Sequence, residues 1–351
     1  MTLHSIRTFT FTVSTGLIAV ACLPPGADAG SLRPILPSAV RANGTQALPP
    51  ELLFIPTETG TIDIYRLKEP SKPIAQITGL KNFQDQMVVD AGGNLFVTNN
   101  GAFGVDDYVS EYAPPYNSAP VILSTAWKGK TFFPIGIAVD AGGTLYVSNC
   151  GTYCGEKPRI FEYPPGATSP SQAVTSAQFD SLAGLAADAG GNIYIANWNV
   201  TTFAADVFKL TPGSTNPKPL GLRGLLGTYG TGVSLDASGD MYVSSFVTSS
   251  YILEFKPGKR ESFRVIDLAS WFQQGPLIID VGPDDNLYAP VVCTAPPCRD
   301  VYVFGPSGNK PLERVGVQGS IGEIASVATY PNLALRGSLR SRTRSARRTL
   351  P

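Results

Sequence analysis

Residues 88–100 read VVDAGGNLFVTNN, and later stretches repeat this phrase as AVDAGGTLYVSNC (138–150) and AADAGGNIYIANW (186–198). When all copies are aligned on the aspartate that follows the first apolar run, that residue falls at Asp90, Asp140, Asp188, Asp236 and Asp280, at intervals of 50, 48, 48 and 44 residues. A sixth copy begins at Ile324 and carries Ala328 in place of the aspartate. A period of 44 to 50 residues is typical of a propeller blade of four strands.

Each repeat reads as four short strands rich in Val, Ile, Tyr and Phe, separated by clusters of Gly, Pro, Asn and Asp. In the third blade these strands are GIAVD (136–140), TLYVSN (144–149), RIFEYPP (159–165) and SQAVTSA (171–177). The N-terminal segments 51–57, 61–67 and 72–78 resemble second, third and fourth strands with no first strand before them. The C-terminal copy at 324–329 supplies the missing strand, and closing the ring in this way leaves no open end blade. The sequence therefore predicts an all-β, six-bladed propeller over residues 51–335, whose first blade is closed by the C-terminal strand.

The repeated DAGG segment is predicted to form the hairpin between the first and second strands of a blade. Glycine adopts positive φ without strain, and an aspartate side chain accepts hydrogen bonds from turn amides. We therefore interpret the five aspartates as turn residues. The rival interpretation is one metal site in each blade.

The two ends of the chain do not follow the repeat. Residues 1–29 combine Arg7, an apolar run from Phe11 to Leu23 and a small-residue site before Gly30, which is the pattern of a secretory signal peptide. Lipoprotein anchoring at Cys22 is the minor alternative. We expect residues 30–50 to be a linker and residues 336–351, with six Arg and no acidic residue, to be a basic disordered tail. The predicted location is secreted or periplasmic.

The DAGGN segments, each followed by Asn and later by a strand end such as YPPG, resemble the NHL-repeat propellers. They also resemble the wider group of six-bladed propellers that includes gluconolactonase/regucalcin-like enzymes. The resemblance implies the fold, and it leaves both a binding platform and a hydrolase open, because the same fold serves both.

In the lactonase-like family the resemblance implies a metal in the central channel, held by residues five positions before the strand-ending aspartate. The matching positions in this chain are Asp85, Ile135, Ala183, Thr231, Gly275 and, in the split first blade, Glu323. Glu323 and Asp85 are therefore the candidate metal ligands, and Ca²⁺ is the candidate ion. Two carboxylates fall short of the six to eight oxygens that Ca²⁺ takes, so the alternative is a hydrated, polar channel entrance.

Several chemistries are excluded by composition. The only histidine, His4, lies in the predicted signal peptide, so a mature chain has no Ser-His-Asp relay and no His-ligated zinc. The formal net charge is zero, which gives no overall field toward nucleic acid, and no apolar run after the signal segment is long enough to cross a membrane.

Four cysteines remain after removal of the signal segment, in two closely spaced pairs. An exported chain with paired cysteines favours disulfides, and local pairing predicts Cys150–Cys154 and Cys293–Cys298. The rival interpretation is a redox or metal role.

Four aromatic residues follow the ends of predicted second strands: Phe103, Tyr153, Trp198 and Phe246. They are candidates for a recognition surface on one face of the ring, and the alternative is that they pack over the edge of the core. We predict a monomeric, non-catalytic propeller, without a cofactor, that binds a protein, peptide or glycan. The alternatives are a metal-dependent lactonase-type hydrolase and a purely structural envelope protein.

Overall fold

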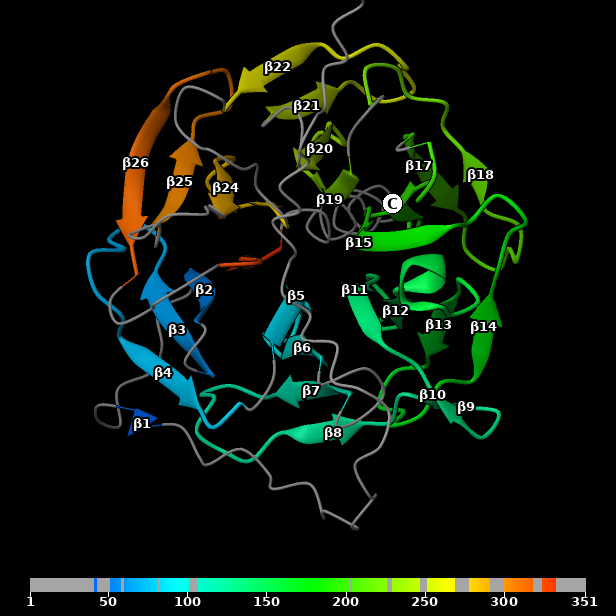
Figure 1. The fold of residues 1–351 in the computed structure, drawn as a ribbon. Helices are drawn as coiled ribbons and strands as arrows, with labels where there is room; N and C mark the ends of the chain where they lie inside the picture. Colours follow the sequence, from blue (N-terminus) through cyan, green and yellow to red (C-terminus); the bar gives the residue numbers. More distant parts are fainter. Residues whose placement is uncertain are drawn as a thin grey trace, which may run out of the picture.

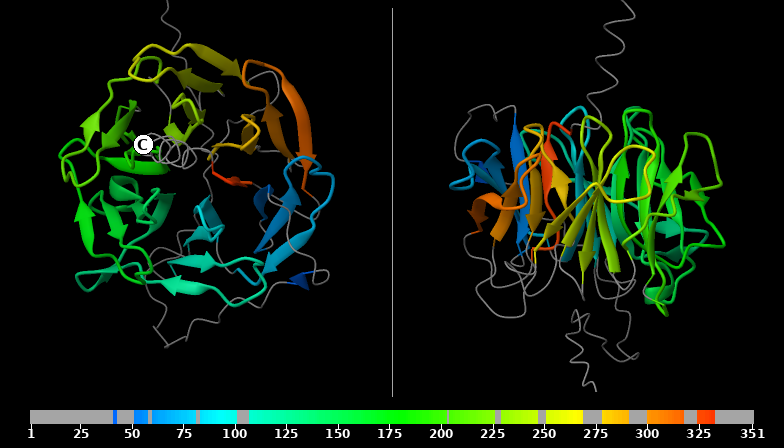
Figure 2. Two further views of the ribbon diagram at one scale, coloured as in Figure 1. Left: turned by 180° about the vertical axis from the view of Figure 1, so that it is seen from behind. Right: turned by 90° about the horizontal axis from the view of Figure 1, so that it is seen from above.

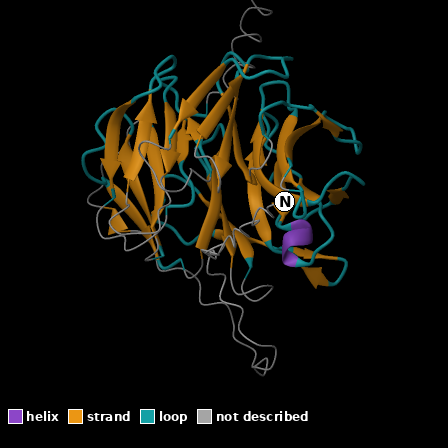
Figure 3. Cartoon of the chain, turned by 45° about the horizontal axis from the view of Figure 1, so that its top comes forward, coloured by secondary structure: helices purple, strands orange, loops and turns teal. Residues whose placement is uncertain are grey.

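The computed structural model describes residues 41–42, 51–57, 60–80, 83–100, 107–202, 204–225, 229–246, 251–268, 278–290, 300–317 and 324–332. Within these ranges the side chains of residues 41–42, 83, 153, 229–231 and 246 are not described. The described elements are strands apart from one short 3-10 helix, η1 (Gly151–Cys154), as Figure 3 shows.

Six sheets stand around a central axis and form a closed ring (Figure 1). Blade 2 contains β5 (Phe83–Val89), β6 (Leu95–Asn100), β7 (Tyr108–Tyr112) and β8 (Val121–Leu123). Blade 3 contains β11 (Pro134–Val139), β12 (Leu145–Asn149), β13 (Ile160–Tyr163) and β14 (Gln172–Val174). Blade 4 contains β15 (Ser181–Ala187), β16 (Ile193–Trp198), β17 (Ala205–Leu210) and β18 (Lys218–Pro219). Each sheet is antiparallel, and its first strand lies nearest the axis.

The remaining blades continue the same order. Blade 5 contains β19 (Tyr229–Leu235), β20 (Met241–Phe246), β21 (Tyr251–Phe255) and β22 (Arg264–Asp267). Blade 6 contains β23 (Asp280–Val281), β24 (Leu287–Pro290), β25 (Asp300–Phe304) and β26 (Pro311–Gly316). A small hairpin of β9 (Ala126–Trp127) and β10 (Lys130–Thr131) connects blades 2 and 3. Figure 2 shows the ring from behind and edge-on.

Blade 1 is built from both ends of the chain, as the sequence predicts. The C-terminal strand β27 (Ala328–Tyr330) pairs with β2 (Leu52–Thr57), and β3 (Thr61–Arg66) and β4 (Ala75–Thr78) follow outward. In this pairing Leu53 lies opposite Thr329. A further short strand, β1 (Arg41–Ala42), comes from the predicted linker and pairs with the outer edge of β4.

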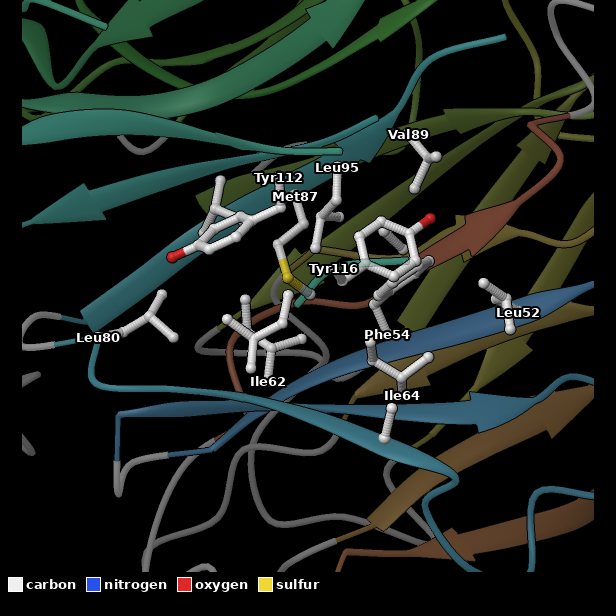
Figure 4. Packing of buried hydrophobic residues seen from close by; sticks show 14 residues of the cluster. Leu52, Phe54, Ile62, Ile64, Leu80, Met87, Val89, Leu95, Tyr112 and Tyr116 are labelled. Carbon is white, nitrogen blue, oxygen red and sulfur yellow. The ribbon is translucent and has the colours of Figure 1, made fainter. Parts of the chain in front are cut away.

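The hydrophobic core lies between blades and not inside any one of them. Side chains of blade 1 such as Phe54 pack against side chains of blade 2 such as Met87 and Leu95, as Figure 4 shows. The Tyr116 ring lies 5.3 Å from Phe54, edge to face, and its hydroxyl donates to the Gly93 carbonyl at 2.7 Å. The sequence repeats because this packing surface repeats: one sheet cannot bury both of its faces alone.

The DAGG hairpins have the predicted role. In blade 2 the Asp90 Oδ1 accepts from the amides of Gly92 and Asn94, both at 2.8 Å. The aspartates of blades 3, 4 and 5 accept the equivalent pairs of amides. Gly93 has φ 88°, a conformation that glycine adopts freely. These contacts support the turn interpretation for those four aspartates.

Blade 6 departs from the sequence alignment by two residues. Gly282, and not Asp280, makes the turn bonds, since its amide donates to Asn286 O at 2.8 Å and its carbonyl accepts from Asp285 N at 3.0 Å. The ladder pairs Asp280 with Tyr288, just as Val88 pairs with Phe96 in blade 2. Asp280 therefore lies inside the first strand, and the alignment on Asp280 was wrong because its spacing resembled the turn aspartates.

Candidate functional site

The two faces of the ring carry different connections. The DAGG hairpins and the turns between third and fourth strands lie on one face, which we call the hairpin face. The connections from second to third strands, and from each fourth strand to the next blade, lie on the other, which we call the loop face. In propellers, functional groups lie on the loops at such a face or along the axis.

The Gln86 side chain joins the inner edges of three blades. The first strand of each blade pairs with the second strand on one edge only. The amides and carbonyls on its inner edge, toward the axis, need other hydrogen-bond partners. The Gln86 side chain, from β5, donates to Leu185 O at 2.8 Å and accepts from the amides of Ile137 and Leu185, both at 3.0 Å. This residue therefore hydrogen-bonds blade 2 to the inner edges of blades 3 and 4.

Hydroxyl groups of the second strands connect neighbouring blades in the same way. Thr98 Oγ1 donates to Ile135 O at 3.0 Å, and Ser148 Oγ donates to Ala183 O at 3.0 Å. Ile135 and Ala183 are the positions in blades 3 and 4 that match the metal ligands of the lactonase-like family. Their side chains offer no ligand atom, and their carbonyl oxygens already accept hydrogen bonds.

Asp280 connects blade 6 to both of its neighbours. Its Oδ2 accepts from Thr329 N and Thr329 Oγ1, both at 2.8 Å, in blade 1. Its Oδ1 accepts from Ser234 Oγ of blade 5 at 3.2 Å and from Val281 N at 2.9 Å. Burial raises the pKa of Asp280 to about 6, although these bonds favour the carboxylate. The axial cavity beside it has a volume of about 30 Å³, which is room for a water molecule or two.

A second polar group lies where blade 2 meets the loop face. Asp85 is partly buried in β5, and desolvation together with the charge of Asp107 raises the pKa of Asp85 to about 8. Glu156, in the connection after β12, accepts from Phe133 N at 3.1 Å and from Asn149 Nδ2 at 2.9 Å. Burial, chiefly, raises the pKa of Glu156, and the Asp107 charge adds to the effect. The Asp107 charge therefore acts on carboxyl groups of two blades, Asp85 in blade 2 and Glu156 in blade 3.

The predicted site residues have different outcomes. Asp85 lies where blade 2 meets the loop face, and its predicted partner Glu323 lies outside the described residues. Leu53 pairs with Thr329 in blade 1 as Leu95 pairs with Val89 in blade 2, so Tyr330 occupies the position that Asp90 has in blade 2. Five residues earlier, the position that matches Asp85 is therefore Ala325 and not Glu323. The pairing of Glu323 with Asp85 thus loses its positional support and stays untested.

The remaining predicted residues that the structure describes lie at the ends of strands or in and beside η1. Trp198, at the end of β16, is 8% exposed, which matches the packing alternative. Phe103 lies outside the described residues, as do the side chains of Tyr153 and Phe246. The disulfide Cys150–Cys154 is present and spans η1. The Cys293–Cys298 pair lies outside the described residues and stays a prediction.

Sequence reasoning missed Gln86 and Asp280 as contacts between blades. The signal was available for Gln86, because the corresponding positions of blades 3, 4 and 5 are all glycine: Gly136, Gly184 and Gly232. A Cβ at Gly136 would clash with the carbonyl oxygen of Ala183, so the backbone at this position lies close to the neighbouring blade. A glutamine there has to extend along the axis.

Replacing Gln86 by alanine is expected to destabilise the fold by about 2–4 kcal/mol, because two buried amides and one carbonyl lose their partner. Chemical denaturation of Gln86→Ala measures this. The control is Gln172→Ala, an exposed residue of β14 that we expect to change stability by less than about 0.5 kcal/mol. Equal effects of the two substitutions would contradict the axial role of Gln86.

Replacing Asp85 by asparagine is expected to remove a pH dependence of stability. Because the folded-state pKa of Asp85 is raised from 3.8 to about 8, the folded protein holds a proton that the unfolded chain releases, and stability falls as pH rises through this range. Between pH 6 and pH 8 the stability of Asp85→Asn should rise by about 2–3 kcal/mol relative to the unsubstituted protein. Urea unfolding at both pH values measures the difference, and a constant difference would show that the Asp85 carboxyl titrates normally.

Known structures share the architecture. No protein-family model matches the chain, and no curated protein matches it either. A chain in the crystal structure of a nidogen/laminin complex has a TM-score of 0.63 and 16% identity, over 80% of this chain and 98% of that chain. A gluconolactonase from Xanthomonas campestris has a TM-score of 0.54 and 15% identity, over 80% and 91%. The chain shares the six-bladed fold of this group.

A third similar structure is a protein of unknown function from Bacteroides caccae, with a TM-score of 0.56 and 12% identity over 81% of this chain and 100% of that chain. At these identities the likeness establishes the fold alone. In the part of the chain that the structure describes, no helix has the length and apolar character that a membrane span requires.

The calcium site of the lactonase-like group does not fit the residues described on the axis. Ca²⁺ takes six to eight oxygens. At the matching positions Asp85 supplies a carboxyl, but Ile135 and Ala183 supply no side-chain oxygen and their carbonyls are engaged. Within the described ranges, no three Asp, Glu, Cys or His side chains gather closely enough to hold a metal ion.

Proposed function

We propose that the protein is an exported, non-catalytic propeller that binds a protein, peptide or glycan through its loop face. The observation that carries the proposal is the bridge of Gln86 across the axis. A substrate that approached the axis beside blades 3 and 4 would have to compete with the three hydrogen bonds of this side chain. The remaining surfaces for recognition are the two faces and the outer wall of the ring.

Hydrogen bonds and a disulfide fix connections at the loop face of blades 3 and 4. A rigid surface suits binding because less conformational entropy is lost on association. In blade 4 the Asp180 Oδ2 accepts from Asn199 Nδ2 at 2.7 Å, and Asn199 Oδ1 accepts from Thr202 N at 2.7 Å. In blade 3 the Cys150–Cys154 disulfide closes the equivalent connection. The connections of two neighbouring blades are thus fixed in shape.

Export and a protein partner are supported indirectly. A disulfide persists in oxidising compartments, and residues 1–29 have the composition of a signal peptide. The similar chain in the nidogen/laminin structure belongs to a protein–protein complex. A protein or peptide ligand is therefore the first class to examine.

The test uses labelled protein beginning at Gly30 on peptide and glycan arrays. Two variants in blade 4 form a matched pair of exposed threonines: Thr201→Arg on the loop face and Thr215→Arg on the hairpin face. We expect saturable binding that Thr201→Arg weakens at least tenfold and Thr215→Arg leaves unchanged. Binding that only Thr215→Arg weakens, or no saturable binding, would overturn the proposal.

The lactonase alternative has its own test, because Glu323 lies outside the described residues. The protein is dialysed against Ca²⁺, its metal content is measured, and hydrolysis of glucono-δ-lactone is followed with and without EDTA. We expect no stoichiometric Ca²⁺ and no hydrolysis above the background rate. A bound ion together with EDTA-sensitive hydrolysis would replace the binding proposal by the enzyme alternative.

A further inference from the structure

One carboxyl group lines the axial cavity of the ring. The cavity has a volume of about 30 Å³, and its polar lining comes from Gln86, Ser234, Asp280 and Asn332. Among the lining residues that the structure describes, Asp280 alone has an ionisable side chain, and the others are apolar or neutral. Asp280 is partly buried in blade 6, and a space of this size holds a water molecule or an ion of similar size.

No positive side chain compensates the Asp280 carboxylate. Its four hydrogen-bond donors are neutral: two belong to Thr329, one to Ser234 and one is the Val281 amide. Burial raises the pKa of Asp280 to about 6 although these bonds oppose it, and no lysine or arginine among the described residues contributes to that pKa. The carboxyl group is therefore mostly ionised at neutral pH and above. A charge that is withdrawn from bulk water normally has a cationic partner or binds a metal ion.

We propose that the axial cavity beside Asp280 binds one monovalent cation, sodium or potassium, at the place where blades 5, 6 and 1 meet. One positive charge balances the single carboxylate of the lining. The ion takes the space of a water molecule, with a carboxylate oxygen of Asp280 as its charged ligand. Water and neutral oxygens along the lining supply the remaining ligands.

A monovalent ion suits this cavity better than a divalent one. Sites for Ca²⁺ bring several carboxylates to one point, and the described residues contain no such group of three. The position also differs from the one that holds the metal in the lactonase-like family. The ladder pairs Asp280 with Tyr288 as it pairs Val88 with Phe96, so Asp280 lies further along the first strand of its blade than the position of Asp85.

The expected consequence of the ion is a more stable closure of the ring. Thr329 belongs to β27, the strand that closes blade 1, and its amide and hydroxyl both donate to Asp280 Oδ2. Ser234 joins the same carboxyl group to blade 5. A cation that binds the folded ring and not the unfolded chain therefore stabilises the fold, and the effect grows with the concentration of the cation.

The experiment compares thermal unfolding of the full chain in sodium, potassium and tetramethylammonium chloride at equal ionic strength and mildly alkaline pH. Tetramethylammonium carries the same charge but is too large for the cavity. We expect the melting temperature in sodium or potassium chloride to exceed that in tetramethylammonium chloride by about 3 °C or more. Binding is measured directly by broadening of the ²³Na resonance on addition of protein, which potassium should reverse by competition.

Two substitutions in blade 6 separate the cavity from the surface. Asp280→Asn removes the charge at the axis and should abolish both the difference between the salts and the broadening of the ²³Na resonance. Asp285→Asn removes an exposed carboxylate from the turn of the same blade and should leave both unchanged. If Asp280→Asn does not fold, the salt comparison and the ²³Na measurement on the unsubstituted protein decide the question.

Equal melting temperatures in the three salts without broadening of the ²³Na resonance would overturn the inference. So would an undiminished sodium effect in folded Asp280→Asn, or displacement of sodium by one equivalent of Ca²⁺, since that would identify a divalent site. None of these measurements involves a peptide or glycan at the loop face, so this inference and the proposed function are tested separately.

Discussion

Deletion of residues 324–351 is expected to abolish the soluble folded protein. The deletion removes β27, the innermost strand of blade 1, and with it the buried side chains of Ile324, Val327 and Ala328. Burial of each large apolar side chain contributes about 1.5–3 kcal/mol to the free energy of unfolding. The deletion also removes the hydrogen bonds between β27 and β2 and the two bonds from Thr329 to Asp280. The total approaches the whole stability of a typical domain, about 5–15 kcal/mol.

A shorter deletion, of residues 336–351, is the control. The sequence predicts these residues to be a tail outside the propeller, so we expect the melting temperature to change by less than about 2 °C. The measurement is the soluble yield and thermal unfolding of both truncated proteins. If the protein without residues 324–351 melted like the full chain, β27 would not be needed to close the ring.

Replacing Arg264 by methionine is expected to cost about 3–5 kcal/mol, because it leaves a buried carboxylate without its main partner. Arg264 Nε lies 2.6 Å from Glu254 Oε2, and both residues are buried. Its Nη1 also donates to Gly305 O at 3.3 Å and Gly308 O at 3.2 Å in blade 6. Lys256, at 3.3 Å from Glu254, is more exposed and compensates only in part.

The matched control is Arg314→Met in blade 6, where an exposed arginine lies 3.4 Å from Asp300. An exposed pair contributes about 0–1 kcal/mol, so urea unfolding should separate the two variants clearly. The double variant Arg264→Met with Glu254→Leu should recover part of the loss, since it no longer buries an unpaired charge. A small effect of Arg264→Met, equal to that of Arg314→Met, would show that the buried pair contributes no net stability.

The period of the sequence was sufficient to predict the fold, because packing between blades imposes the same pattern on every repeat. The DAGG turns, the split first blade and the Cys150–Cys154 bond all follow from local chemistry that the sequence displays. The contacts between blades were harder to predict. Gln86 interacts with residues far along the chain, and the glycines at its matching positions in blades 3, 4 and 5 show that the position is unusual without showing what the glutamine bonds to.

Asp280 illustrates the opposite error. Its spacing from the turn aspartates is close enough to align it with them, yet its side chain accepts hydrogen bonds from Thr329 and Ser234. The turn itself is made by Gly282. The shift arises because the turn of blade 6 uses Asp284, whose Oδ1 accepts from Asn286 N. The effect of the Asp107 charge on the pKa of Asp85 was likewise hidden, since it depends on β5 and the residue before β7 lying on either side of β6 in one blade.

Hydrogen exchange of β27 tests most directly whether the two ends of the chain close one ring. If β27 is the inner strand of blade 1, peptides covering Ala328–Tyr330 should exchange through the same global opening as peptides covering Leu52–Thr57, with protection factors within about tenfold of each other. Exchange of Ala328–Tyr330 more than about a hundredfold faster, while Leu52–Thr57 stays protected, would show that the ring is stable without its C-terminal strand and would contradict the closed propeller.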